Sequence, residues 1–361
     1  MSSDGNESKT AAAWSSGEVD RVDLQQASTI HMTDITWLWQ GWIALNKLHL
    51  LAGDAGTGKT TLALAIAAVV SRGGTWPDGS LAPAGNVLVW SGEDDVGDTI
   101  APRLRAAGAD MEKIFVVGDV RVGHASRPFD PATDLRLLVE EAGRVGDIAL
   151  LVVDPVVSVI AGDGHKNTEV RRSLQPLVDL ATHLGCGVLG ISHFSKGSSA
   201  SDPLQRVTGS VAFGAVARVV LVAAKKGGSD MRVIARAKSN IGPDEGGFAY
   251  QIAVSDGEFP ASYVTWGESL EGTAKALLTD FDAVEIENNA LKAGEKWLRA
   301  FLAHGPHFAT DVMRGSQAAG LSWRTVERAK ESIGVRSVRA PKVGRWQWSL
   351  QPSSPPTPPS E

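Results

Sequence analysis

Residues 47–70 read KLHLLAGDAGTGKTTLALAIAAVV, and this stretch decides how the rest of the chain is interpreted. Its centre, Gly53-Asp54-Ala55-Gly56-Thr57-Gly58-Lys59-Thr60, fits the phosphate-binding pattern G-x-x-x-x-G-K-[ST]. The apolar run before it predicts a strand, and the Ala/Leu-rich run from Thr61 predicts a helix. Between a strand and a helix, backbone N–H groups and the positive end of the helix dipole surround one anion. Both flanks therefore disfavour the alternative of a glycine-rich turn that fits the pattern by chance.

This pattern assigns a role to each polar residue of the loop. We expect residues 53–61 to bind ATP, because the loop's N–H groups cradle the phosphates. The Lys59 ammonium reaches the β- and γ-phosphates in such loops, and the Thr60 hydroxyl ligates Mg²⁺.

The composition is that of an ordinary globular protein. The 361 residues are 43% hydrophobic and 21% charged, which suits one large domain and a smaller one. No apolar run reaches the length of a membrane span, so we expect no membrane association. The single cysteine, Cys186, cannot form an intramolecular disulfide and fits a cytoplasmic location. A net charge of −6 disfavours nucleic-acid binding by the whole surface but permits local basic patches.

Strand-like and helix-like runs alternate from about residue 39 to residue 266. The expected strands are 47–53, 86–91, 148–154, 187–192, 218–224, 231–237 and 247–254. The first four are nearly continuous apolar runs, as in parallel strands that are covered on both faces. The last three follow one another closely across turn residues and predict antiparallel hairpins. The fold class is therefore α/β, with a mostly parallel sheet, helices on both faces and antiparallel strands at its end.

The chain divides into five expected segments. A disordered arm over residues 1–28 precedes a nucleotide-binding domain over 29–266. An acidic linker over 267–291 leads to a small domain over 292–350, and a Pro/Ser-rich disordered tail occupies 351–361.

The small domain carries a net positive charge, whereas the net charge of the whole chain is negative. It holds eleven Lys and Arg residues against four Asp and Glu residues. Its pattern predicts three helices, at 293–304, 309–320 and 322–334, with Ser322 as the N-cap of the third. A hairpin that ends in Trp346-Gln347-Trp348 completes a winged helix-turn-helix.

The third predicted helix of this domain presents polar and basic residues for phosphates or base edges: Arg324, Thr325, Arg328 and Lys330. A winged helix also serves as a protein-docking or oligomer-stabilising module. The sequence favours nucleic acid and leaves this alternative open.

Three polar residues end predicted strands beside the loop. Asp154 ends the apolar run Ala149–Val153 and is placed to hold Mg²⁺. Glu93 follows Val87–Ser91 and is our choice for the carboxylate that orients the attacking water. The alternative is that Glu93, Asp94 and Asp95 only cap the next helix. His193 ends the run from residue 187, where it is either a γ-phosphate sensor or a surface histidine.

These motifs, taken together, resemble the RecA-like ATPases of the RepA type, the hexameric replicative helicases of plasmids and phages. The resemblance spans about residues 39–255. Its carriers are 53–60, 90–95 with Arg103-Leu104, 151–155, 191–196, 208–213, Ala217-Arg218 and 238–240. It implies a homo-oligomeric ring, usually a hexamer, with ATP between neighbouring subunits. It also implies Glu93 as catalytic base, Asp154 on Mg²⁺ and His193 as γ-phosphate sensor.

A ring of this kind completes each site with an arginine from the adjacent subunit. The candidates are Arg206, Arg218, Arg236 and Lys238, with Arg206 preferred. The pair Arg236-x-Lys238 reverses the Lys-x-Arg order that is usual in such helicases, so its transfer is in doubt.

Contact with single-stranded DNA is expected from two flexible, weakly basic loops, 161–167 and 195–206. Surface loops that bind nothing are the alternative. Trp37, Trp39 and Trp42 precede the first strand, where they either stack on adenine or close the edge of the domain.

We therefore expect an ATP-hydrolysing, ring-forming motor on single-stranded DNA in plasmid, phage or mobile-element replication. One rival is a recombination or regulatory ATPase that does not translocate. The other is a DNA-binding regulator whose winged helix reads a site under the control of ATP.

Overall fold

The computed structural model describes residues 22–164, 166–194, 203–207, 211–226, 229–340 and 344–350. Contacts divide the chain into two units, Met1–Ile35 and Thr36–Glu361, which are described separately. In the first unit, residues 22–35 are exposed and contain one short 3₁₀ turn at Ala27–Thr29. Most of the predicted disordered arm and all of the predicted tail 351–361 lie outside the described residues.

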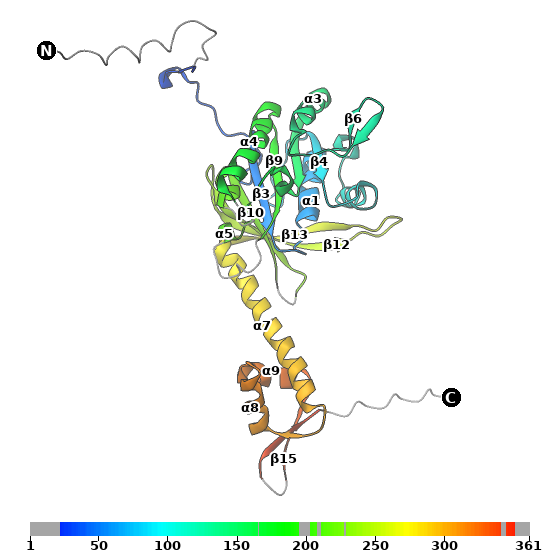
Figure 1. Cartoon of the computed structure of the whole chain (residues 1–361), viewed down its shortest axis with the longest axis vertical. Coiled ribbons are helices and arrows are strands. Elements are labelled where there is room, and N and C mark those ends of the chain that lie inside the picture. Colours follow the sequence, from blue (N-terminus) through cyan, green and yellow to red (C-terminus); the bar gives the residue numbers. More distant parts are fainter. Residues whose placement is uncertain are drawn as a thin grey trace, which may run out of the picture. The chain divides into compact units, whose positions relative to one another are not determined.

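A nine-stranded sheet forms the centre of the second unit (Figure 1). In order across the sheet, the strands are β5 (Ile114–Val116), β4 (Asn86–Ser91), β8 (Ile148–Asp154), β9 (Gly187–His193), β3 (Lys47–Gly53), β10 (Val219–Lys225), β11 (Arg232–Ser239), β12 (Glu245–Val254) and β13 (Ser262–Thr273). The strands from β5 to β10 pair in parallel. The pairs from β10 to β13 are antiparallel. The predicted fold class is confirmed.

Helices cover both faces of this sheet, which explains the long apolar runs of its strands. On one face, α1 (Lys59–Arg72) and α2 (Ala101–Ala106) pack with one side of β3, β4, β8 and β9. On the other face lie α3 (Leu135–Val145), α4 (Asn167–Leu184), α6 (Val211–Val216) and the start of α7 (Ala274–Leu302). Neighbouring residues of one strand, such as Leu50 and Leu51, therefore enter different cores, and both are fully buried.

Two of the three tryptophans before the first predicted strand are buried and close the edge of the domain. Trp39 and Trp42 are buried, and Trp39 stacks on Trp42 and on Trp76 with centroid distances of 4.7 Å in both cases. They belong to β1 (Trp37–Trp39) and to the turn before β2 (Ile43–Ala44), which pair as a small separate ladder. Phe248 of β12 packs against the same rings, so this aromatic cluster joins the two ends of the domain.

The predicted linker 267–291 lies within regular secondary structure. Residues 267–273 complete β13, and the following residues belong to the continuous helix α7. The Thr273 hydroxyl accepts a hydrogen bond from the Ala276 N–H and caps this helix. The strand was overlooked because it is an edge strand, in which exposed or half-buried side chains and two glycines hide the alternation of a buried strand. Leu278, from the first turns of α7, is buried in the core of the sheet.

The C-terminal domain has its own core. The end of α7, with α8 (Ala309–Ala318) and α9 (Trp323–Ser332), packs with a three-stranded sheet of β14 (His307–Phe308), β16 (Trp346–Ser349) and β15 (Arg336–Arg339). Leu298, Val312, Val326 and Trp348 are buried in it. The Ser322 side chain accepts a hydrogen bond from the Thr325 N–H, as predicted for an N-cap. This order of elements is that of a winged helix.

Candidate nucleotide-binding site

The predicted phosphate loop lies between the end of β3 and the start of α1. Gly56 and Gly58 have φ angles of 79° and 84°, a left-handed conformation that favours glycine. A Cβ at Gly58 would also clash with Cδ1 of Ile252, so the end of that side chain would have to move. The Lys59 ammonium donates to the carbonyl groups of Gly53 and Asp54 at 3.0 and 2.9 Å. The chain therefore folds back on itself in the cradle form that an anion requires.

Thr60 at the start of α1 and Asp154 at the end of β8 meet at one edge of the sheet, as a shared Mg²⁺ site requires. The Thr60 hydroxyl donates to Asp154 Oδ2 at 2.6 Å. Burial raises the pKa of Asp154, the Thr60 hydrogen bond opposes this, and the negative charges of Glu93 and Asp94 add to it. Both groups offer the hard oxygen ligands that Mg²⁺ prefers, and such sites are usually completed by phosphates and water. Accordingly, no cluster of three His, Cys, Asp or Glu side chains suited to a metal occurs among the described residues.

The three carboxylates after β4 separate into different roles. Asp95 caps the short helical turn Val96–Ile100 by accepting from the N–H groups of Gly97 and Asp98. Asp94 forms an ion pair with Arg103 of α2 at 2.9 Å. Glu93 is exposed at the strand end.

Glu93 also lies within electrostatic reach of the loop. Burial lowers the pKa of Lys59, and the charges of Asp154, Asp54 and Glu93 oppose this change. The Gly92 N–H donates to the Asp154 carbonyl at 2.8 Å, which holds the Glu93 segment beside the end of β8. Of the three acids, Glu93 is the one whose carboxylate is available to orient a water molecule.

His193 lies at the same edge of the sheet, in register with Gly53. Partial burial lowers the pKa of His193, the nearby positive charge of Lys59 lowers it further, and Glu93 opposes both. The imidazole is therefore neutral near pH 7. A neutral ring beside Lys59 and Glu93 fits a group that hydrogen-bonds a phosphate oxygen or the attacking water.

Arg206 occupies a position that the sequence did not predict. It ends α5 (Pro203–Arg206), is 5% exposed and forms an ion pair with Asp54 of its own phosphate loop at 2.9 Å. Its guanidinium also lies 4.3 Å from the centroid of the Phe194 ring. A buried arginine that is paired in this way does not fit the expected role of reaching into a neighbouring subunit.

Two of the other expected candidates are also engaged within the chain. Arg236 donates to the Glu245 carbonyl and stacks over Trp42. Lys238 donates to the carbonyl groups of Gly214 and Ala217.

Arg218 is exposed, and its side chain makes no hydrogen bond or ion pair with the part of the chain that the structure describes. Its N–H donates to the Leu48 carbonyl, at the edge of the sheet opposite the phosphate loop. The five residue steps from Leu48 to Gly53 span about 16 Å, so Arg218 is remote from its own loop.

The β12–β13 hairpin supports the loop from outside, and sequence reasoning missed it. The Tyr250 hydroxyl donates to the Thr57 carbonyl at 2.8 Å, and Tyr250 is buried. Ile252 packs against Gly58, and Ser262 Oγ lies 3.5 Å from Thr61 Oγ1. A Tyr-x-Ile run within the predicted strand 247–254 carries no local signal of this contact, because the partners are about 190 residues apart in sequence.

The two loops expected to touch DNA are only partly described. Residues 195–202 and His165 lie outside the described residues. In the first loop, Lys166 pairs with Glu169 at 3.1 Å, so its charge is partly neutralised. This loop follows β8 on the edge that carries Asp154.

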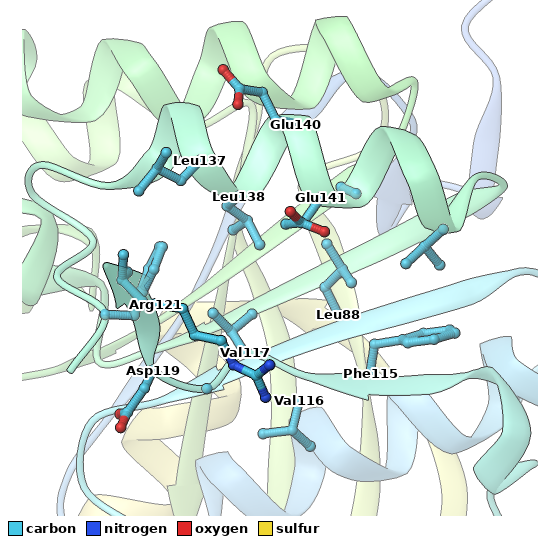
Figure 2. A pocket seen from close by; sticks show the side chains of 15 residues that line it. Leu88, Phe115, Val116, Val117, Asp119, Arg121, Leu137, Leu138, Glu140 and Glu141 are labelled. Atoms are coloured by element: carbon cyan, nitrogen blue, oxygen red, sulfur yellow. The ribbon is translucent and has the colours of Figure 1, made fainter. Parts of the chain in front are cut away.

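A separate cavity of about 500 Å³ lies between β5 and α3, at the edge of the sheet that β5 forms (Figure 2). Phe115, Val117 and Leu138 line it together with Arg121 and Glu141. Its lining is mainly apolar and includes none of the predicted site residues. Among the described residues, no helix is both long enough and apolar enough to cross a lipid bilayer.

Comparison with known families agrees with this geometry. A family model described as an AAA domain, AAA_25, matches residues 17–199, just over half of the chain. The match includes the phosphate loop, Glu93, Asp154 and His193 and stops before β10. No curated protein matches the chain. The chain therefore belongs to the AAA_25 family of AAA domains, P-loop NTPases with a RecA-like core.

Proposed function

We propose that this protein is an ATP-hydrolysing motor of the RepA-like type, which acts on single-stranded DNA as a ring of identical subunits. The observation that carries the proposal is the convergence of Lys59, Thr60, Asp154 and Glu93 at one edge of the sheet. A P-loop that only binds nucleotide needs no carboxylate beside the γ-phosphate, whereas hydrolysis does.

Each side chain has a distinct task in hydrolysis. Lys59 and the N–H groups at the start of α1 hold the β- and γ-phosphates. Thr60 and Asp154 would hold Mg²⁺, which neutralises charge on the phosphate oxygens. Glu93 orients the attacking water and accepts its proton, and neutral His193 donates or accepts a hydrogen bond at the γ-phosphate.

The arginine geometry supports sites that are shared between subunits. Phosphoryl transfer is strongly accelerated by an arginine at the γ-phosphate. Arg206 and Arg103 are paired with acids, and Arg218 faces the opposite edge of the sheet. In a head-to-tail assembly one subunit's Arg218 meets the next subunit's loop, and an interface of this kind closes into a ring where the rotation between subunits permits it. We therefore assign the trans role to Arg218 and not to Arg206.

The C-terminal domain supports DNA as the partner, but through a different surface from the one predicted. On α9, exposed Arg324 is accompanied by exposed Glu327 and Glu331, and Lys330 lies over the Trp348 ring. Residues 333–350 instead hold four basic residues and no acid. Arg336, Arg339 and Arg345 are exposed there, and Trp346 is 57% exposed.

This β15–β16 wing combines phosphate-binding charge with a ring on which a base can stack. Cross-strand pairing puts Arg339 opposite Trp346, so the two side chains share one face. The wing is therefore the part of the C-terminal domain that we assign to DNA.

The proposal is tested by ATP turnover of the full chain with and without single-stranded DNA, with particle mass from light scattering. Stimulation by DNA in a multi-subunit particle supports the motor. A monomer whose rate of ATP turnover is the same with and without DNA would refute the proposal. Lys59→Ala serves as the inactive reference, and Arg105→Gln, an exposed change on α2, controls for loss of positive charge.

A forked DNA substrate then separates the motor from its rivals. Strand displacement identifies a helicase, whereas a recombination or regulatory ATPase leaves the fork intact. Sequence-specific footprinting that depends on ATP, without displacement, identifies a DNA-binding regulator.

A further inference from the structure

The phosphate loop contains a carboxylate at a position where negative charge opposes its function. Asp54 is the second residue of the loop, and its side chain is 61% exposed. Its backbone carbonyl accepts from the Lys59 ammonium, and its carboxylate is near enough to favour the charged form of Lys59. A triphosphate held by the same lysine would be repelled by this carboxylate, because like charges at short range destabilise each other.

Arg206 compensates for this charge from the opposite side. Its Nη2 lies 2.9 Å from Asp54 Oδ2, and its side chain is 6% exposed. The Phe194 ring supports the guanidinium at 4.3 Å, immediately after His193 at the end of β9. The arginine is therefore held from two sides, by the loop and by the segment that leaves the sheet after the sensor histidine.

We propose that Arg206 is a positioning residue that neutralises Asp54 within its own subunit and thereby allows the phosphate loop to accept a triphosphate. The same pair ties the segment after β9 to the loop, so a nucleotide that attracts Arg206 away from Asp54 alters both. The inference rests on the nucleotide use of the family and holds whether or not the protein moves on DNA.

Nucleotide binding by the full-length chain tests this with four variants: Asp54→Asn, Arg206→Gln, Arg206→Lys and the double variant Asp54→Asn/Arg206→Gln. Calorimetry measures Kd for ADP and for a non-hydrolysable ATP analogue, both with Mg²⁺. Arg206→Gln removes the positive charge that neutralises the Asp54 carboxylate, so binding of the ATP analogue weakens about tenfold or more, and ADP binding weakens less. Asp54→Asn removes the repelling carboxylate and binds the ATP analogue more tightly than the wild type.

The double variant decides between neutralisation and direct contact. The double variant has no carboxylate to neutralise, so its Kd for the ATP analogue lies within about threefold of that of Asp54→Asn. The loss of affinity in Arg206→Gln depends on the presence of both partners. If the double variant stays as weak as Arg206→Gln, Arg206 contacts the phosphate or only supports the fold, and the proposal fails. Arg206→Lys keeps the charge and retains most of the affinity.

Two further comparisons keep the proposal open to refutation if Arg206→Gln folds poorly. Asp54→Asn retains the arginine, and a tenfold loss of affinity in this variant alone would overturn the proposal. Arg105→Gln removes an exposed arginine and leaves Kd unchanged. Failure of the wild-type chain to bind any nucleotide would instead refute the proposed function.

Discussion

His49, in the central strand β3, makes the stability of the sheet depend on pH. Its ring is fully buried, Nε2 accepts from the Ala44 N–H at 2.9 Å, and Nδ1 faces the Val188 carbonyl at 3.1 Å. This arrangement uses the neutral tautomer with a proton on Nδ1, and a second proton on Nε2 would oppose the Ala44 N–H. Burial lowers the pKa of His49 from 6.5 to about 4, although the hydrogen bond to Val188 opposes the change.

The direction of this pH dependence follows from the number of protons that the folded and unfolded chains bind at His49. Between pH 4 and pH 6.5 the unfolded chain binds more protons at this histidine than the folded chain does, so stability rises with pH. The contribution is complete above pH 6.5 and is lost as the pH falls toward 4. The full difference is worth about 3.4 kcal/mol, and about 2 kcal/mol of it disappears between pH 7.5 and pH 5.

Urea unfolding at pH 7.5 and pH 5, followed by fluorescence of the buried Trp39 cluster, measures this loss. The free energy of unfolding of His49→Gln should depend less on pH than that of the wild type, by about 2 kcal/mol over this interval. His183→Gln, an exposed change on α4, is the matched control and keeps the wild-type dependence. Equal losses in the wild type and His49→Gln would show that this buried ring does not titrate as argued.

Four further predictions each concern one substitution. Glu93→Gln should bind nucleotide normally and reduce phosphate release a hundredfold or more, roughly the contribution of a general base. Thr60→Ala should raise the Mg²⁺ concentration needed for half-maximal ATP hydrolysis, while its urea midpoint stays near that of the wild type. Tyr250→Phe leaves the buried Thr57 carbonyl without its donor and should cost about 1 to 3 kcal/mol in urea unfolding. Leu298→Ala should cost about 2 to 5 kcal/mol in unfolding of the C-terminal domain, and an unchanged melting curve would contradict its burial.

The strands that were predicted well are those buried on both faces. Expected ranges 47–53, 86–91 and 148–154 coincide with β3, β4 and β8, because burial on both faces demands unbroken apolar runs. The strand β5 was missed because three residues are too few to show a period, and the edge strand β13 was missed because exposed edges tolerate charge and glycine.

The residue types that form the site could be predicted from the sequence, but the role of each residue could be predicted less well. The P-loop pattern fixes Lys59 and Thr60 because backbone geometry and chemistry lie in one contiguous segment. The assignment of Glu93 over its neighbours needed the partners of Asp94 and Asp95, which are contacts and not patterns. The pairing of Arg206 within its own chain could not be predicted, because its partner, Asp54, lies 152 positions away in the sequence.

The central claim is that ATP is split in a site to which two subunits contribute, with Glu93 from one and Arg218 from the next. Mixing Glu93→Gln subunits with Arg218→Ala subunits tests this most directly, because each variant alone should be inactive. In a random equimolar assembly, about one quarter of the sites join an intact Glu93 to an intact Arg218, so turnover should recover to about that fraction of the wild-type rate. Mixed particles of confirmed composition that remain inactive, or wild-type turnover by Arg218→Ala alone, would contradict the account.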